Sequence, residues 1–242
     1  MAFAFEVVRH GARPSQENWD TEYFTVSPGM LTPEGMRQRY LLGKYNRERY
    51  TQEYDLISDE YDPAEIFIQS TNVNRTLQSG YSELLGLYPP QKGGAEKLNQ
   101  GMVDSLSQGM GLPPFKVREA KKINADLGFA ALPNDFTAIP ILDFMNHDIN
   151  NDADTDGCNW IEETIAPRLD CPAIWDNFEY MRADTREPVK ACMNLTDDQI
   201  DNVIFHTYYH YTDAVVALNF EGTEHCKDKY FTDDIWLEMN EI

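Results

Sequence analysis

The chain has 242 residues, of which 42% are hydrophobic and 25% are charged, a composition typical of a folded globular protein rather than a disordered one. Its 41 Asp and Glu residues outnumber its 20 Lys and Arg residues, giving a formal net charge of −21. This charge disfavours binding to nucleic acid or to an anionic membrane, and a phosphorylated substrate would need a local cluster of arginines to overcome the repulsion.

The first 90 residues alternate between strand-like and helix-like segments. Residues 2–8 (AFAFEVV) are mainly apolar and predict a buried strand. Thr32 and Pro33 are a suitable N-cap and first position for a helix through Arg47. A second strand is predicted at residues 66–68, and a second helix follows from about Val73 to Gly86. This order is typical of a βαβ unit with parallel strands and predicts an α/β fold.

The rest of the chain has a different character. The stretch 93–139 is rich in Gly, Pro, Asn and Gln and predicts mostly loop with short strands. Thr196 and Gln199 form a capping box that opens one helix extending to Leu218. A last helix begins at Thr232 and has no stop signal before the end of the sequence, so we expect the chain to end within an element.

Features that bear on cellular location point in two directions. The sequence has no run of 18 apolar residues and shows no signal peptide after Met1, which predicts no membrane segment and leaves open either a cytosolic chain or a missing leader. Four cysteines allow two disulfides in any of three connectivities, and they indicate a secretory compartment together with the glycosylation sequon at Asn194. These cysteines are Cys158, Cys171, Cys192 and Cys226.

A cluster of basic residues directly follows the first predicted strand. Arg9 and Arg13 flank His10 closely, and Arg75 lies in the first turn of the second predicted helix. Since ligands of parallel sheets collect at the carboxyl ends of the strands, we expect these residues to meet at one edge. A neutral imidazole can attack phosphorus while arginine forks hold the phosphoryl oxygens, and a helix N-terminus also favours an anion. The pattern predicts a phosphate site.

Three segments together resemble the histidine acid phosphatases, a branch of the histidine phosphatase superfamily. They are residues 7–14 (VVRHGARP), 70–79 (STNVNRTLQS) and 84–90 (LLGLYPP), in the same order and spacing as in that family. The resemblance is close over residues 5–90 and looser beyond them.

The resemblance implies a fold, a reaction and a set of residues. It implies a doubly wound, mainly parallel sheet with flanking helices and a helical cap insertion. Residues 1–90 would form the N-terminal part of the core, and 91–242 would form a loop-rich segment and a mainly helical cap, leaving the core incomplete. His10 would be the nucleophile and Arg9, Arg13 and Arg75 the phosphate ligands in the hydrolysis of small-molecule phosphomonoesters, without cofactor or metal. A lysosomal or secreted location is also implied.

One departure from the family pattern affects the expected activity. The family carries a downstream His-Asp pair whose Asp protonates the leaving alcohol, and we expect this chain to end before that point. The sequence holds one His-Asp pair, His147-Asp148, but it lacks the preceding apolar strand and is not expected to be the donor. The second hypothesis is therefore a catalytically impaired, phosphate-binding fragment or pseudoenzyme. A mutase-like phosphotransferase fits less well, because that branch shares Arg-His-Gly but not the later segments.

Two other motifs resemble metal sites. Asp152, Asp154, Asp156 and Glu163 match the spacing of a calcium loop, although Asn159 and Trp160 break the pattern and a solvated acidic loop fits better. A second pair, His206 and His210, has the spacing of a zinc helix but lacks the glutamate of a metalloprotease. These two histidines are expected on a helix surface.

Overall fold

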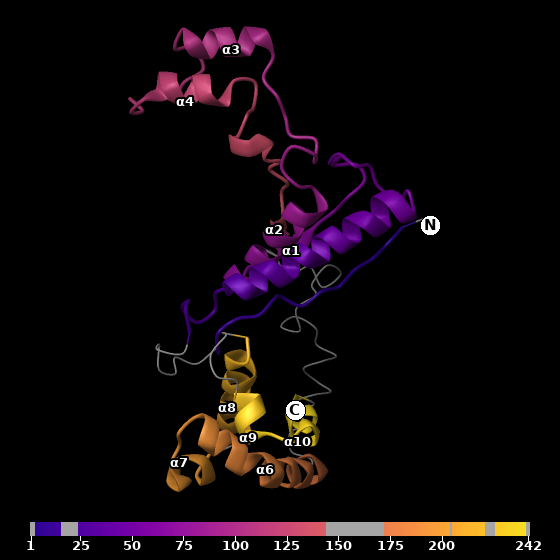
Figure 1. Cartoon of the computed structure of the whole chain (residues 1–242), viewed down its shortest axis with the longest axis vertical. Coiled ribbons are helices and arrows are strands. Elements are labelled where there is room, and N and C mark those ends of the chain that lie inside the picture. The colour runs from indigo at the N-terminus through magenta and orange to yellow at the C-terminus, as the bar shows by residue number, and fades with distance from the viewer. Residues whose placement is uncertain (1–2, 16–23, 144–171, 204, 221–225, 241–242) are drawn as a thin grey trace. The chain divides into compact units, whose positions relative to one another are not determined.

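The computed structural model describes residues 3–15, 24–143, 172–203, 205–220 and 226–240. Figure 1 shows a mainly helical chain within these ranges. The elements are α1 (Pro33–Arg47), η1 (Glu48–Glu53), β1 (Gln69–Ser70), α2 (Asn74–Leu87), α3 (Gln100–Ser107), α4 (Ala120–Leu127), η2 (Pro133–Asp135), β2 (Leu142–Asp143), α6 (Pro172–Cys192), α7 (Asp197–Asp201), α8 (Phe205–Leu218), α9 (Cys226–Tyr230) and α10 (Asp233–Asn240).

The chain divides into two compact units, each made of several stretches of sequence. The first contains residues 1–8, 39–69 and 80–142, and the second contains residues 9–38, 70–79 and 143–242. All four predicted phosphate-site residues fall in the second unit. The predicted division of the chain near residue 90 stays a prediction.

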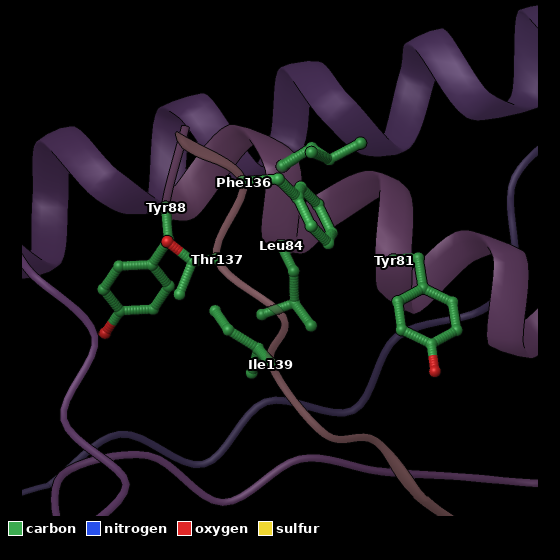
Figure 2. Close-up of a pocket in the computed structure, with 7 residues that line it drawn as sticks. Tyr81, Leu84, Tyr88, Phe136, Thr137 and Ile139 are labelled. Carbon is green, nitrogen blue, oxygen red and sulfur yellow. The ribbon is translucent and has the colours of Figure 1, made fainter. Parts of the chain in front are cut away.

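Helices α1 and α2 touch through glycines in the first unit. A Cβ atom added at Gly43 would collide with the carbonyl oxygen of Glu83, and one added at Gly86 would collide with that of Tyr40. Leu84 of α2 and Tyr88, the residue after α2, pack against Ile139 in the segment that precedes β2. All three side chains are buried. Figure 2 shows these residues around a small cavity of about 10 Å³, with Tyr81, Phe136 and Thr137 also in its lining.

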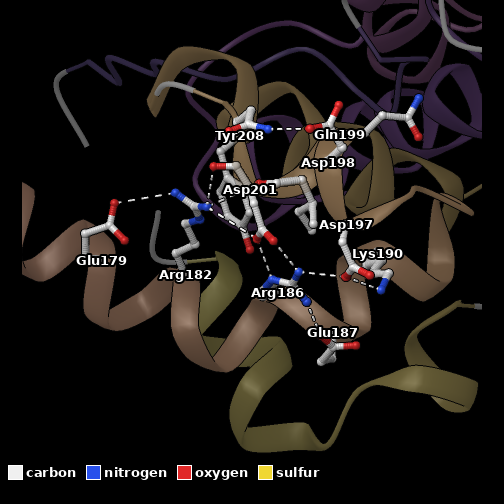
Figure 3. Close-up of polar contacts among 12 residues, drawn as sticks. Glu179, Arg182, Arg186, Glu187, Lys190, Asp197, Asp198, Gln199, Asp201 and Tyr208 are labelled. Atoms are coloured by element: carbon white, nitrogen blue, oxygen red, sulfur yellow. Dashed lines mark hydrogen bonds and ion pairs between the residues drawn. The ribbon is translucent and has the colours of Figure 1, made fainter.

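Helix α6 is the centre of the second unit. It contacts α7, α8, α9 and α10, as Figure 1 also shows, and its last residue, Cys192, forms a disulfide with Cys226 of α9. This pairing fits one of the three predicted connectivities. The core of the unit contains Val189, Ile200 and Tyr208. On its surface, Arg186 of α6 pairs with Asp197 and Asp201 of α7 (Figure 3).

Several predicted elements are confirmed, with local reasons. Helix α1 begins at Pro33 as predicted, and the hydroxyl of Thr32 accepts a hydrogen bond from the Gly35 N–H at 3.0 Å, as an N-cap does. Helix α2 ends at Leu87, one residue from the predicted end. The capping box of Thr196 and Gln199 is present at the start of α7.

The predicted strands are the main correction. Residues 3–8 form no strand, and the side chains of Phe3, Phe5 and Val7 are exposed. The second strand begins at Gln69 instead of residue 66 and has two residues. A strand exists only through hydrogen bonds to a neighbour, and within the described residues the one sheet is the pair β1–β2, joined where the Leu142 N–H donates to the Ile68 carbonyl.

Two further predictions are corrected in part. The stretch 93–139 is mostly loop as predicted, but it contains helices α3 and α4 where short strands were expected. Local caps such as Asn99, which accepts from the Met102 N–H, support these helices despite the content of helix-breaking residues. The helix expected from Thr196 to Leu218 is two helices, α7 and α8, since α7 ends at Asp201 and its C-cap residue Asn202 has a non-helical backbone. Among the described residues, no helix has the length and apolar character needed to cross a membrane.

Candidate phosphate site

The segment 9–15 carries three of the four candidate residues and has no regular secondary structure. Its backbone is held from two sides. The Ala12 N–H donates to the Gln38 side chain of α1 at 2.9 Å, and the Thr32 N–H donates to the Ala12 carbonyl at 3.0 Å. From the other side, the Gly11 N–H donates to the Ser79 hydroxyl of α2 at 3.1 Å. These hydrogen bonds provide partners for backbone groups of a segment that forms no strand.

Gly11 is needed for packing at this point. A Cβ atom at Gly11 would collide with the backbone of Gly35 in the first turn of α1, and a Cβ atom at Gly35 would collide with the backbone of Ala12. The glycine of the Arg-His-Gly motif therefore allows loop and helix to touch.

Ser79 connects the two basic segments. Its hydroxyl accepts from Gly11 and donates to the Arg75 carbonyl at 2.7 Å, one turn earlier in α2. The Ser79 side chain is buried. One hydroxyl thus links the backbone next to His10 to the backbone of Arg75, in the first turn of a 14-residue helix.

The imidazole of His10 is half-buried, and its Nδ1 lies 2.8 Å from the Gly11 carbonyl oxygen. Since a carbonyl can only accept, Nδ1 carries the hydrogen in this contact and Nε2 keeps its lone pair in the neutral ring. Burial lowers the pKa of His10, and the charges of Arg9, Arg13 and Arg75 lower it further, while the bond to Gly11 raises it. The environment therefore favours the neutral form that a nucleophile needs.

The three guanidiniums differ in their surroundings. Arg9 is exposed, and Arg13 is buried with 6% of its surface accessible. Arg75 is half-buried, and burial together with the charges of Arg13 and Arg9 lowers its pKa, while Asp213 raises it. Arg13 forms a two-bond ion pair with Asp213, at 2.8 and 2.9 Å. The Nε–H groups of Arg13 and Arg75 are buried, and no described residue accepts a hydrogen bond from either of them.

The structure brings the four predicted residues into one electrostatic cluster, and two further residues belong to it. Ser79 lies in a segment that supported the family resemblance but had no role assigned to it. Asp213 is 138 positions after Arg75 and could not be connected to it by any motif. The sequence does single out Asp213 in one way. It is the one acidic residue of α8, a helix that otherwise buries apolar and neutral side chains.

The remaining candidate sites have separate outcomes. The pair His147-Asp148 and the calcium-like residues Asp152, Asp154, Asp156 and Glu163 lie outside the described residues. His210 is buried in α8 and not on its surface, because that helix packs into the core on several sides; the side chain of His206 is not described. Among the described residues, no three His, Cys, Asp or Glu side chains lie close enough together to hold a metal ion.

The first 137 residues of the chain match a known protein family. The model of the histidine phosphatase superfamily (branch 2) matches residues 1–137, more than half of the sequence. The chain belongs to this superfamily. The match confirms the relationship expected from the three sequence segments and supports the α/β fold class of this histidine phosphatase.

Curated relatives of this chain are named as phosphatases. Mouse prostatic acid phosphatase is 40% identical over 96 residues, which are 38% of this chain and 24% of that protein. Mouse lysophosphatidic acid phosphatase type 6 is 40% identical over 91 residues (35% and 22%). The lysosomal acid phosphatase of Xenopus laevis is 36% identical over 96 residues (38% and 22%). The aligned segments span about a quarter of these relatives.

Among solved structures, the phytase from Citrobacter braakii is similar with a TM-score of 0.48 and 13% sequence identity. The superposition covers 96% of this chain and 56% of the phytase.

Proposed function

We propose that this histidine phosphatase hydrolyses phosphomonoesters through a phosphohistidine intermediate on His10. The observation that carries the proposal is the neutral, half-buried imidazole of His10 within the field of Arg9, Arg13 and Arg75. The acid phosphatase names of the aligned relatives support it. A pseudoenzyme is not favoured, since the relatives that can be aligned are named as phosphatases.

The chemistry follows from the groups in place. Nε2 of His10 attacks phosphorus, the ester P–O bond breaks, and the leaving alkoxide takes a proton from solvent water to become the alcohol. Water then attacks the phosphohistidine and releases inorganic phosphate. Arg9, Arg13 and Arg75 would hold the phosphoryl oxygens and stabilise the charge that spreads over them in the transition state. The local guanidiniums are also needed to attract a phosphate ester to a chain of net charge −21.

Hydrolysis of 4-nitrophenyl phosphate at acid pH by the 242-residue chain tests the proposal. His10→Ala should reduce turnover to background and remove the acid-labile phosphate label on the protein. Arg75→Met should lower kcat/KM by about 10²-fold or more, because a donor to the transition state is lost. Arg118→Met removes an exposed arginine elsewhere and should leave the rate unchanged. Phosphate binding without turnover in the wild-type chain would contradict hydrolysis.

We also propose the family architecture and location for this protein. The architecture is a doubly wound, mainly parallel sheet with flanking helices and a helical cap, with residues 1–90 in the core and the later helices in the cap. The family match and the helical second unit support it. A lysosomal or secreted location is supported by the names of two relatives and by the Cys192–Cys226 disulfide, which persists in oxidising compartments. Recovery of the protein in the cytosolic fraction of its cell would contradict this location.

A further inference from the structure

Arg13 is held by a carboxylate that the sequence motif does not include. Nη1 of Arg13 donates to Oδ2 of Asp213 at 2.9 Å, and Nη2 donates to Oδ1 at 2.8 Å. The accessible fractions of the two side chains are 5% and 11%. Such a buried, bidentate pair fixes the plane of the guanidinium as well as its position. Asp213 comes from α8, so this helix determines how Arg13 is oriented.

The pair uses only one of the two bidentate faces of the guanidinium. Nη1 and Nη2 form the end face, which Asp213 occupies, and Nη1 also donates to the Pro14 carbonyl at 2.9 Å. The side face consists of Nε–H and the second Nη2 hydrogen. The Nε–H is buried and finds no acceptor within the described part of the chain, although a buried donor left unpaired costs stability. This side face matches the two-oxygen geometry of a phosphoryl group.

We propose that Asp213 is a positioning residue of the phosphate site, which holds Arg13 by its end face so that the side face receives phosphoryl oxygens. The inference rests on the proposed function, because it assigns phosphate to the same cluster. Both carboxylate oxygens of Asp213 already accept hydrogen bonds from Arg13, which suits orientation better than delivery of a proton. The negative charge also offsets the repulsion between Arg13, Arg75 and Arg9, and the effect of Asp213 on the pKa of Arg75 reflects this.

Calorimetric titration of the 242-residue chain with inorganic phosphate measures this role without turnover. Asp213→Asn keeps the shape but weakens the bidentate pair, and it should bind phosphate about tenfold more weakly. Asp213→Glu keeps the charge and should restore part of the affinity. Asp184→Asn removes the same charge from an exposed position in α6, and its affinity should stay within about twofold of wild type.

A double-mutant cycle separates positioning from general stability. In an Arg13→Ala background, Asp213→Asn should change phosphate affinity no more than Asp184→Asn does, because the group that Asp213 orients is absent. A purely structural role would lower the melting temperature without this coupling. Unchanged or tighter phosphate binding by folded Asp213→Asn would overturn the inference.

The outcomes also separate this inference from the proposed function. If wild-type chain binds no phosphate, both fail. If it binds phosphate and Asp213→Asn binds equally well, only the role of Asp213 fails. If Asp213→Asn does not fold, the comparison passes to Asp213→Glu, for which affinity equal to wild type would reject positioning and a loss with intact folding would support it.

Discussion

The imidazole of His10 is the residue whose protonation decides whether the site can react. Its pKa is lowered from the ordinary value of 6.5, first by burial and then by three neighbouring arginines. Both causes disfavour the imidazolium, so a larger neutral fraction remains as the pH falls. This shift would allow a histidine nucleophile to work in an acidic compartment.

An NMR titration tests the shift directly. We expect the His10 ring signal, assigned through its loss in His10→Ala, to titrate below 6.5. Arg75→Met removes one positive charge and should raise the pKa of His10, whereas Arg118→Met, at an exposed position, should leave it in place. An unperturbed titration midpoint, or no response to Arg75→Met, would show that the arginines do not act on this ring.

Residues of the site were predictable to the extent that they carry a local signal. Arg9, His10 and Arg13 occur together in one motif, and Arg75 occurs in a second motif at a helix start. Asp213 has no such motif, because its contact with Arg13 spans 200 positions and depends on how α8 packs. Sequence patterns report local geometry and periodic burial, whereas a single ion pair between distant segments is decided by tertiary structure.

At the scale of elements, helix boundaries were predicted better than strands for a physical reason. The cap of α1 is a hydrogen bond between Thr32 and Gly35, two residues within one four-residue stretch, so the sequence encodes it locally. A strand at residues 3–8 requires a neighbouring strand to form its hydrogen bonds and cover its side chains, and its own sequence cannot supply one. The glycine contacts between α1 and α2 also join segments that are distant in the sequence, so local patterns do not predict them.

Gly86→Ala tests those contacts. Alanine favours a helix over glycine by about 1 kcal/mol, but here its Cβ atom would collide with the Tyr40 carbonyl oxygen of α1. We expect the collision to dominate and to lower the free energy of unfolding by about 1–3 kcal/mol in urea denaturation. Gly101→Ala in the exposed helix α3 is the control, because its new Cβ atom would lie 3.3 Å from the Asn99 side-chain oxygen instead of colliding with backbone, and it should lower stability much less than Gly86→Ala does. Equal stability of Gly86→Ala and wild type would mean that the two helices do not touch closely.

For the whole molecule, the net charge of −21 and the arginine cluster act on a phosphate ester with opposite signs. They also act over different ranges, since the guanidiniums would touch the phosphate whereas the acidic excess is spread over the chain. Raising the ionic strength from about 0.01 M to about 0.1 M shortens the screening length from about 30 Å to about 10 Å. Added salt should therefore weaken the distant repulsion more than the contacts made by Arg9, Arg13 and Arg75.

We expect the affinity for inorganic phosphate to rise over this range of ionic strength, contrary to the usual weakening of anion binding by salt. Calorimetric titration in a salt whose anion competes weakly would measure it, with Arg13→Ala as the control that has lost part of the local attraction. A steady fall of affinity with salt would show instead that the field of the arginines extends beyond the site.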